Sequence, residues 1–356
     1  MKLFITGICG FVGNSLASWF HEHRPSFKIS GIDNFVRPGS EINRSNLRAR
    51  GITVQHGDIR NASDFESLPA VDWVIDAAAN PSVLAGVDNR SSSRQLIEHN
   101  LFGTVNLLEY CRRAKAGIVL LSTSRVYSIS ALGRLPLVKG EHSFKWEKGA
   151  PPVQGASANG LTTEFSTSSP ISLYGSTKVA SEFLALEYKH SFSLPLWVNR
   201  CGVIAGAGQF GTAEQGIFSY WIHAYAQKRP LKYIGFDGSG RQVRDGLHPE
   251  DLAELIAAQM DYSQKSQFTT FNVGGGASNA MSLAQLTNWC TERFGEHSIE
   301  SDLAPRPFDV PWLVMDNHQI TTQLNWRPKR DLPSILDEIA NHAQRNPHWL
   351  DLSSAP

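Results

Sequence analysis

The chain begins with a short apolar run that leads directly into three glycines spaced for a turn. Residues 3–6 are followed by Gly7-Ile8-Cys9-Gly10-Phe11-Val12-Gly13, and residues 13–20 then have the apolar spacing of a helix. Glycine is needed where a chain turns sharply, where backbone approaches a pyrophosphate, and where a helix packs on a strand. The N-terminus of such a helix offers free N–H groups and a positive dipole end to phosphates. This arrangement predicts a nucleotide-binding α/β fold.

An acidic residue stands where such a fold places the ribose of a dinucleotide. Asp33 closes the second predicted strand, 20 residues after Gly13. A carboxylate there accepts hydrogen bonds from the ribose hydroxyls and repels a 2′-phosphate, which favours NAD over NADP. Arg37 lies close by and would weaken that preference. The alternative interpretation is a tight structural turn with a surface aspartate.

Strand-like and helix-like segments alternate through the first half of the chain. Further strands are expected at 27–32, 52–55, 73–77, 118–122, 196–200 and 271–273, with a helix at 95–112. Short apolar strands separated by amphipathic helices predict a Rossmann-type, doubly wound parallel sheet covered on both faces. Two segments, 128–170 and 205–216, show no strong period and are expected to be irregular. We expect an NAD-binding domain over 1–200, rejoined by about 243–275, and a smaller, mostly C-terminal α/β substrate lobe over 201–242 and 276–356.

Composition excludes several other classes of protein. Lysine plus arginine and aspartate plus glutamate both number 33, so the formal charge is zero, which argues against binding nucleic acid or membranes through a basic face. The four cysteines have no metal-ligand spacing and are expected to be free thiols in a reducing compartment. The N-terminus lacks the pattern of a signal peptide, and no run of 18 apolar residues occurs. These features predict a cytoplasmic protein.

Two further strand ends are candidates for contact with the dinucleotide. Asp58 and Ile59 follow the third predicted strand and are interpreted as an adenine contact, although Asp58 is equally well explained as a helix N-cap. Ala77, Ala78 and Ala79 follow the fourth, where small side chains would let backbone pass close to the cofactor. Simple close packing explains each alanine equally well.

A tyrosine and a lysine share a predicted helix face in the middle of the chain. Tyr174 and Lys178 are four residues apart where a helix is expected to begin. A phenol has a pKa near 10, and a nearby ammonium lowers that pKa toward the range of a general base. A hydroxyl at the end of the fifth strand would hold the same substrate oxygen. Thr123 is the preferred candidate, with Ser122 and Ser124 as rivals.

Taken together, these residues resemble the extended short-chain dehydrogenase/reductase family, the nucleotide-sugar epimerases and dehydratases. The resemblance covers nearly the whole chain. It includes the glycine turn, Tyr174 with Lys178, Asn100 in His99-Asn100-Leu101-Phe102-Gly103-Thr104, and the runs 242–251, 271–275, 305–309 and 324–328.

The resemblance implies NAD as cofactor, a nucleotide-diphosphate sugar as substrate and a homodimer formed by the helices near 95–112 and 175–190. It implies Thr123, Tyr174 and Lys178 as catalytic residues. Arg244 and Arg306 match the arginines that bind the nucleotide diphosphate, and Asp309 matches the acid near its ribose. Further substrate-binding residues implied are Thr123, Ser124, Gln209 and Gln215. The implied cofactor-binding residues are Gly7, Gly10, Phe11, Val12, Gly13, Asp33, Asn34, Asp58, Ile59, Ala77, Ala78, Ala79, Asn100, Ser122, Tyr174, Lys178 and Cys201.

Within this family the chain is most similar to a branch that epimerises C2 of CDP-hexoses, on the basis of Ser124-Arg125-Val126-Tyr127 and the long segment before Tyr174. That branch oxidises the sugar to a ketone and returns the same hydride to the opposite face. The alternatives are a UDP-sugar 4-epimerase, a nucleotide-sugar reductase or a non-catalytic NAD-binding regulator. A 4,6-dehydratase is disfavoured, because Ser124-Arg125 stands where that chemistry needs Asp-Glu. The sequence departs from the family pattern at Val203, Ala205 and Ser128.

Overall fold

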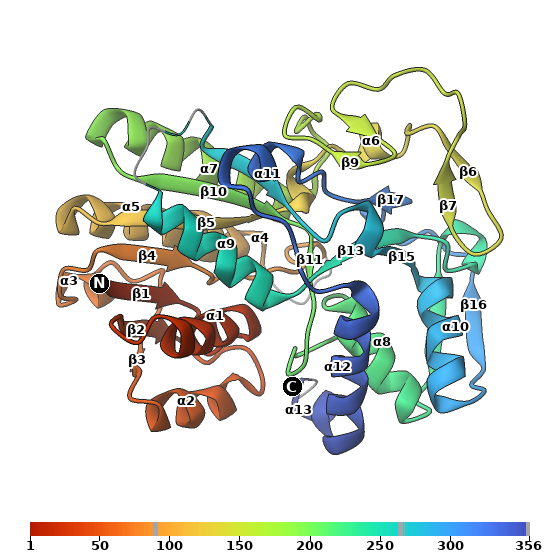
Figure 1. Cartoon of the computed structure of the whole chain (residues 1–356), viewed down its shortest axis with the longest axis horizontal. Coiled ribbons are helices and arrows are strands. Elements are labelled where there is room, and N and C mark those ends of the chain that lie inside the picture. The colour runs from red at the N-terminus through yellow and green to blue at the C-terminus, as the bar shows by residue number, and fades with distance from the viewer. Residues whose placement is uncertain (88–91, 263–265, 267, 354–356) are drawn as a thin grey trace. The chain divides into compact units, whose positions relative to one another are not determined.

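The computed structural model describes residues 1–87, 92–262, 266 and 268–353, and divides into two compact units (Figure 1). Unit 1 comprises Met1–Val126, Leu173–Arg200 and Pro249–Phe271, and unit 2 comprises Tyr127–Ser172, Cys201–His248 and Asn272–Pro356. Within the described residues, no helix is long and apolar enough to cross a membrane.

Unit 1 is built on a seven-stranded sheet with the order β14-β10-β5-β4-β1-β2-β3. Its strands are β1 (Lys2–Thr6), β2 (Lys28–Asp33), β3 (Thr53–His56), β4 (Trp73–Asp76), β5 (Gly117–Thr123), β10 (Leu196–Cys201) and β14 (Thr270–Val273). The pairs β1–β2, β1–β4, β2–β3 and β4–β5 are parallel. The order reverses at β1, and ligands of such sheets bind beside the carboxyl ends of the strands at that point.

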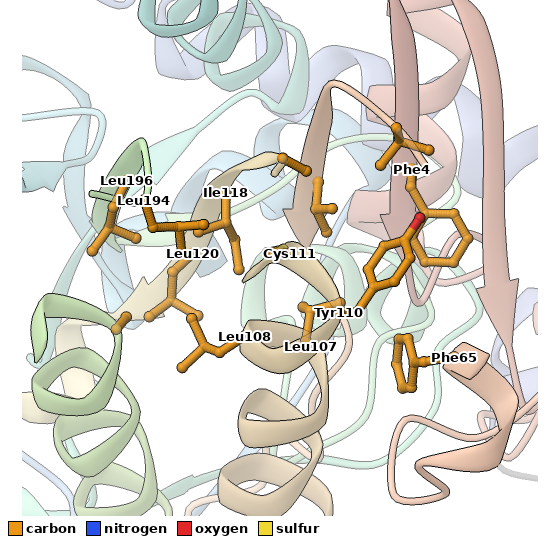
Figure 2. Close-up of a cluster of buried hydrophobic side chains, with 14 of the residues drawn as sticks. Phe4, Phe65, Leu107, Leu108, Tyr110, Cys111, Ile118, Leu120, Leu194 and Leu196 are labelled. Carbon is orange, nitrogen blue, oxygen red and sulfur yellow. The ribbon is translucent and has the colours of Figure 1, made fainter. Parts of the chain in front are cut away.

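Helices cover both faces of this sheet. One face carries α1 (Phe11–His23), α2 (Ser40–Ala49) and α9 (Pro249–Asp261), with α1 beside α9. The other carries α3 (Ser63–Glu66), α5 (Gly103–Ala114) and α7 (Ser172–Phe192) over a buried apolar cluster. Figure 2 shows Leu107, Leu108 and Cys111 of α5 directed toward the sheet, together with Phe4 of β1 and Ile118 of β5. The predicted α/β class and the doubly wound sheet are therefore confirmed.

The helix predicted over residues 95–112 is interrupted. It consists of α4 (Ser93–Ile97), a π-helical turn η1 (Glu98–Phe102) and α5. The interruption falls where space is tight, because a Cβ on Gly103 would lie 2.5 Å from Ile59 Cδ1. His99 and Asn100 are both buried in the π turn. Such turns are frequent at functional sites and leave no signal in apolar spacing.

Unit 2 contains short strands and a helical layer. Strands β11 (Val203–Ile204), β13 (Val243–Leu247), β15 (Ala280–Ser282) and β17 (Trp312–Leu313) form one sheet, and β12 (Leu231–Ile234) pairs with β16 (Ile299–Asp302). Helices α8 (Ile217–Ala226), α10 (Leu283–Phe294), α12 (Leu332–Arg345) and α13 (Trp349–Ser353) share an apolar core. Helix α10 begins with a capping box between Ser282 and Gln285, and Asp331 caps α12. A further short helix, α11 (His318–Leu324), belongs to the same unit.

The compact units differ from the expected domain boundaries at residues 127–172, 243–248 and 272–275, which all belong to unit 2. The first segment holds α6 (Ile129–Leu132), β6 (Leu137–Lys139), β7 (Phe144–Trp146), β8 (Ala156–Ser157) and β9 (Gly160–Leu161). It is bound to distant parts of unit 2, because Leu161 N donates to Val314 O and Phe144 N donates to Arg241 O. The strands of this segment are too short to produce a sequence pattern, and the residues that bind it lie far away in the sequence.

Candidate active site

The glycine turn between β1 and α1 adopts the conformation that a phosphate cradle needs. Gly7 has φ 61°, Gly10 N donates to Gly7 O at 3.0 Å, and a Cβ on Gly13 would lie 2.2 Å from Gly7 O. Helix α1 begins at Phe11 without a side-chain cap. The N–H groups of Phe11, Val12 and Gly13 therefore have no partner within the helix and suit an anion. This backbone fits the pyrophosphate of NAD.

Asp33 is held against this turn at the end of β2. Its Oδ2 accepts from Cys9 N at 2.8 Å and its Oδ1 accepts from Phe35 N at 2.8 Å. Burial raises the pKa of Asp33 above its ordinary value, while these N–H groups act in the opposite direction. Gly10 N–H also acts on this carboxylate. A carboxylate has about four acceptor positions, so a position remains for a ribose hydroxyl. The surface-aspartate alternative is wrong, because Asp33 is buried.

Asp58 lies in a charged cluster beside Asn34. Arg60 donates from Nε to Oδ1 at 2.9 Å and from Nη2 to Oδ2 at 2.7 Å, and Asn34 Nδ2 donates to Oδ2 at 3.0 Å. Burial opposes ionisation, but these bonds outweigh it and hold the pKa of Asp58 well below its usual range. The N-cap alternative is wrong, because Ala62 is the N-cap residue of α3. Ile59 is buried next to it, and an adenine contact stays a prediction.

The alanine run after β4 passes very close to the glycine turn. Thr6 Oγ1 accepts from the N–H groups of Ala77 and Ala78, both at 3.1 Å. A Cβ on Gly7 would lie 2.9 Å from Ala78 Cα. The backbone after β4 therefore leaves no room for a side chain at Gly7. Direct contact of Ala77, Ala78 or Ala79 with NAD stays a prediction.

The side-chain amide of Asn100 forms hydrogen bonds with other residues of the protein. Its Oδ1 accepts from Asn80 N at 2.9 Å, and its Nδ2 donates to Asn80 O at 3.0 Å and to Thr177 Oγ1 at 3.2 Å. Thr177 in turn donates to Tyr174 O at 2.7 Å. Asn100 thus ties the loop after Ala79 to the start of α7. A direct bond from Asn100 to the cofactor stays a prediction.

Tyr174 and Lys178 lie in the first two turns of α7, where the sequence predicts them. Tyr174 packs against Ala85 and Leu96, and Lys178 is 2% exposed. The buried carboxyl of Asp76 interacts electrostatically with Lys178, although burial raises the pKa of Asp76 overall. A phenol and an ammonium on one helix face suit proton transfer to and from a hydroxyl.

The structure distinguishes the three hydroxyl candidates at the end of β5. Ser122 Oγ donates to Glu182 Oε1, so its proton is already committed. Ser124 is buried in the short turn η2 (Ser124–Val126). Thr123 is half-buried, and its Oγ1 accepts from Arg125 N at 3.1 Å, which leaves its proton to donate to a substrate oxygen. These contacts favour Thr123.

The substrate candidates of unit 2 form a second cluster. Arg244 Nη2 and Asp309 Oδ1 are 2.8 Å apart, with the side chains only 12% and 13% exposed. Burial lowers the pKa of Arg244, Asp309 raises it and Arg306 lowers it, so Arg306 lies within electrostatic reach of Arg244. Arg306 Nη2 also donates to Ala213 O at 2.8 Å. The buried carboxyl of Asp245 also acts on Arg244, so the cluster holds two guanidinium groups and two carboxyl groups. A guanidinium group is planar and always charged, which suits a diphosphate, and the pair of Arg244 with Asp309 is not a surface salt bridge.

The remaining candidates have varied surroundings. Gln209 Nε2 donates to Ile204 O at 2.9 Å, while its Oε1 is buried without a partner among the described residues. Gln215 pairs with Thr212 through backbone hydrogen bonds. Cys201 is buried at the end of β10. Among the described residues, no cluster of His, Cys, Asp and Glu side chains is arranged to hold a metal ion.

The three departures from the family pattern have structural roles. Ala205 is fully buried in the core of unit 2, and Val203 packs against the same core. Ser128 caps α6, because its Oγ accepts from Ala131 N at 3.4 Å.

A buried ion pair beside Ser122 was not among the candidates predicted from sequence. Glu182 and Arg200 bond within unit 1, and neither was a candidate. The available signal was the spacing, because Glu182 continues the helix face of Tyr174 and Lys178 by one more turn.

The comparisons with known proteins agree with this geometry. The sequence matches the profile of the NAD dependent epimerase/dehydratase family over residues 3–274. The chain belongs to this family, is an NAD-dependent epimerase and uses NAD as its cofactor.

Among its relatives is a CDP-paratose 2-epimerase of Salmonella typhi, 30% identical over 92% of this chain and 95% of that protein. A UDP-glucuronate 4-epimerase of Thermodesulfobacterium geofontis is 23% identical over 96% of both chains. In fold, the chain is similar to UDP-glucuronic acid 4-epimerase from Bacillus cereus, solved with UDP-glucuronic acid and NAD. That likeness has a TM-score of 0.75 and 22% identity over 97% of this chain and 99% of the other.

Proposed function

We propose that this enzyme inverts C2 of a CDP-hexose of the paratose and tyvelose type. The observation that carries the proposal is the 30% identity to a CDP-paratose 2-epimerase over 92% of this chain. The sequence Ser124-Arg125 after Thr123 supports it, because this pair lacks the acid and base that a sugar dehydratase uses to eliminate water.

In this proposal the cofactor and the candidate residues have separate roles. Bound NAD supplies the acceptor and later the donor of the hydride at the sugar carbon. Tyr174 removes the proton of the sugar hydroxyl, Lys178 stabilises the phenolate, and Thr123 holds the same oxygen. Proton transfer of this kind contributes about 10²–10⁴ in rate. Arg244 and Arg306 bind the diphosphate, and Asp309 binds the ribose of the nucleotide.

A 4-epimerase acting on UDP-sugars is the second candidate, favoured by the relative of Thermodesulfobacterium geofontis. Both reactions use the same Thr123, Tyr174 and Lys178, and they differ in which sugar carbon faces them. The inverted carbon therefore decides between them.

The deciding experiment is proton NMR of the purified protein with CDP-, UDP- and GDP-sugars in D2O, without added cofactor. We expect CDP-paratose and CDP-tyvelose to interconvert with no solvent deuterium at C2 and no net NADH. Inversion at C4 of a UDP-sugar would replace the proposal with the second candidate. Deuterium at the inverted carbon would exclude internal hydride return, and net consumption of added NADH would indicate a reductase.

Tyr174→Phe tests the assignment of the base. We expect at least a 10²-fold loss of turnover with NAD still bound, because the phenol acts in the reaction step. A regulator that only binds NAD would turn over no sugar, and Tyr174→Phe would leave its function in cells intact.

A homodimer in the cytoplasm is also part of the proposal. Unit 1 exposes Phe102 (53%), Phe183 (64%) and Phe192 (50%) on the helices that the family resemblance assigns to a dimer interface. Exposed aromatic side chains of this size are typical of protein–protein contacts.

A further inference from the structure

A buried acid on α7 is connected to two neighbouring strands. Glu182 lies one turn after Lys178 and two turns after Tyr174, so the three side chains follow one face of the helix. Ser122 at the end of β5 donates from Oγ to Glu182 Oε1. Arg200 on β10 donates from Nε to Oε1 at 3.2 Å and to Oε2 at 3.1 Å, and from Nη2 to Oε2 at 2.7 Å.

The geometry makes this connection rigid. The side chains of Arg200 and Glu182 are only 12% and 5% exposed, and the guanidinium engages both carboxylate oxygens. A planar fork of this kind fixes orientation as well as distance. Breaking a buried pair leaves an uncompensated charge, so the pair resists small displacements that an exposed salt bridge would allow.

We propose that Glu182 is a positioning residue, which holds α7 through Ser122 and Arg200 so that Tyr174 and Lys178 face the end of β5. This inference rests on the proposed roles of Tyr174, Lys178 and Thr123. Ser122 directly precedes Thr123, so the bond that holds α7 also fixes the backbone next to the third catalytic candidate. Misplacement of a reacting group by about 1 Å costs about 10²-fold in rate.

The ionisation of Tyr174 gives a readout that a merely structural role would not move. It is measured in the NAD-bound protein as the difference in absorbance at 295 nm between wild type and Tyr174→Phe over a pH series. On the same helix face, Lys178 follows Tyr174 by one turn and Glu182 by two; Asp76 interacts electrostatically with Lys178, and Arg200 pairs with Glu182.

For Glu182→Gln, a purely electrostatic role and a positioning role predict opposite changes in the pKa of Tyr174. Removing a negative charge without movement favours the phenolate and lowers the pKa of Tyr174. Loosening α7 moves Tyr174 and Lys178 together away from the end of β5, so the phenolate loses the stabilisation of Thr123 and of bound NAD there, and the pKa of Tyr174 rises by about 1. We expect the rise.

Turnover gives the second readout. We expect Glu182→Gln to lower kcat about 10²-fold with little change in KM and with NAD retained. Glu187→Gln is the matched control, because it removes the same charge from an exposed position of the same helix. Ser122→Ala keeps the ion pair with Arg200 and cuts only the link to β5. We expect it to lower kcat about tenfold at an unchanged melting temperature.

The inference is overturned when Glu182→Gln matches Glu187→Gln in both the pKa of Tyr174 and kcat, or when the pKa falls. Where Glu182→Gln fails to fold, Glu182→Asp and Ser122→Ala decide by the same two measurements. A wild type that inverts no sugar nucleotide contradicts the proposed function instead, and the titration of Tyr174 still decides the role of Glu182.

Discussion

At the scale of the residue, Asp33 has a structural role in the glycine turn and a predicted role in binding the cofactor. Both of its oxygens accept backbone N–H groups, from Cys9 in the glycine turn and from Phe35. The carboxylate has further acceptor positions and, when ionised, places a negative charge at the edge of the turn. The same group therefore stabilises the turn, and its selection of NAD over NADP stays a prediction.

Asp33→Asn is expected to weaken NAD binding by about 10- to 100-fold, because a hydrogen bond to a charged group contributes about 1.5–3 kcal/mol. The change also removes the charge that repels a 2′-phosphate, so NADP binding relative to NAD is expected to improve. Titration of the cofactor-free protein with NADH and NADPH measures both affinities. Glu41→Gln on α2 serves as the control, and an unchanged ratio of affinities would contradict the assigned role.

At the scale of the element, α8 and α12 meet through two histidines. His223 Nδ1 lies 2.8 Å from Ser219 O, so this nitrogen carries the proton. His223 Nε2 then accepts from His342 Nδ1 at 3.1 Å. Burial lowers the pKa of His223 to about 4 and also lowers that of His342. The contact between α8 and α12 therefore favours the neutral form of both imidazoles.

Acidification is expected to destabilise this helix pair. The unfolded chain takes up a proton at His223 near pH 6.5, whereas the folded chain does so only near pH 4. Stability is thus fully present above about pH 6.5 and is lost as the pH falls toward 4, by about 2 kcal/mol at pH 5. Urea unfolding at pH 7.5 and 5.0 measures this loss.

His223→Gln is expected to reduce the difference between the two pH values. His21→Gln, at an exposed position of α1, is expected to leave the difference unchanged. Equal differences in all three proteins would show that other groups cause the acid sensitivity.

The elements of unit 1 could be predicted from sequence because strands buried on both faces are continuous apolar runs, as in β5. The glycine turn, Asp33, Tyr174 and Lys178 could be placed for a related reason, since their roles depend on local spacing. Two features could not be predicted. The partner of Leu161 is Val314, far away in the sequence. The charge on Glu182 is acceptable in the interior because Arg200 and Ser122 both donate to its carboxylate, and no local sequence pattern pairs these residues.

At the scale of the whole molecule, the exposed side chains of Phe102, Phe183 and Phe192 make the proposed dimer testable. Phe183→Glu is expected to convert a dimer into a monomer, because it places a charge in the middle of an apolar contact. Sedimentation equilibrium measures the change in mass. Val36→Glu, at another exposed apolar position of unit 1, is the control and is expected to remain dimeric. A wild type that sediments as a monomer would contradict the proposed homodimer.

The path of the chain constrains how the protein can be made. Each unit is assembled from three separate stretches, and β14 (Thr270–Val273) supplies the last strand of the central sheet. A nascent chain leaving the ribosome therefore cannot complete the N-terminal sheet until residue 273 has emerged, and by then much of unit 2 has been synthesised. Neither unit can be obtained by cutting the gene at a single point. We therefore expect the chain to fold late in synthesis as one long unit, rather than as two domains that fold one after the other, and chaperones to meet it in that state.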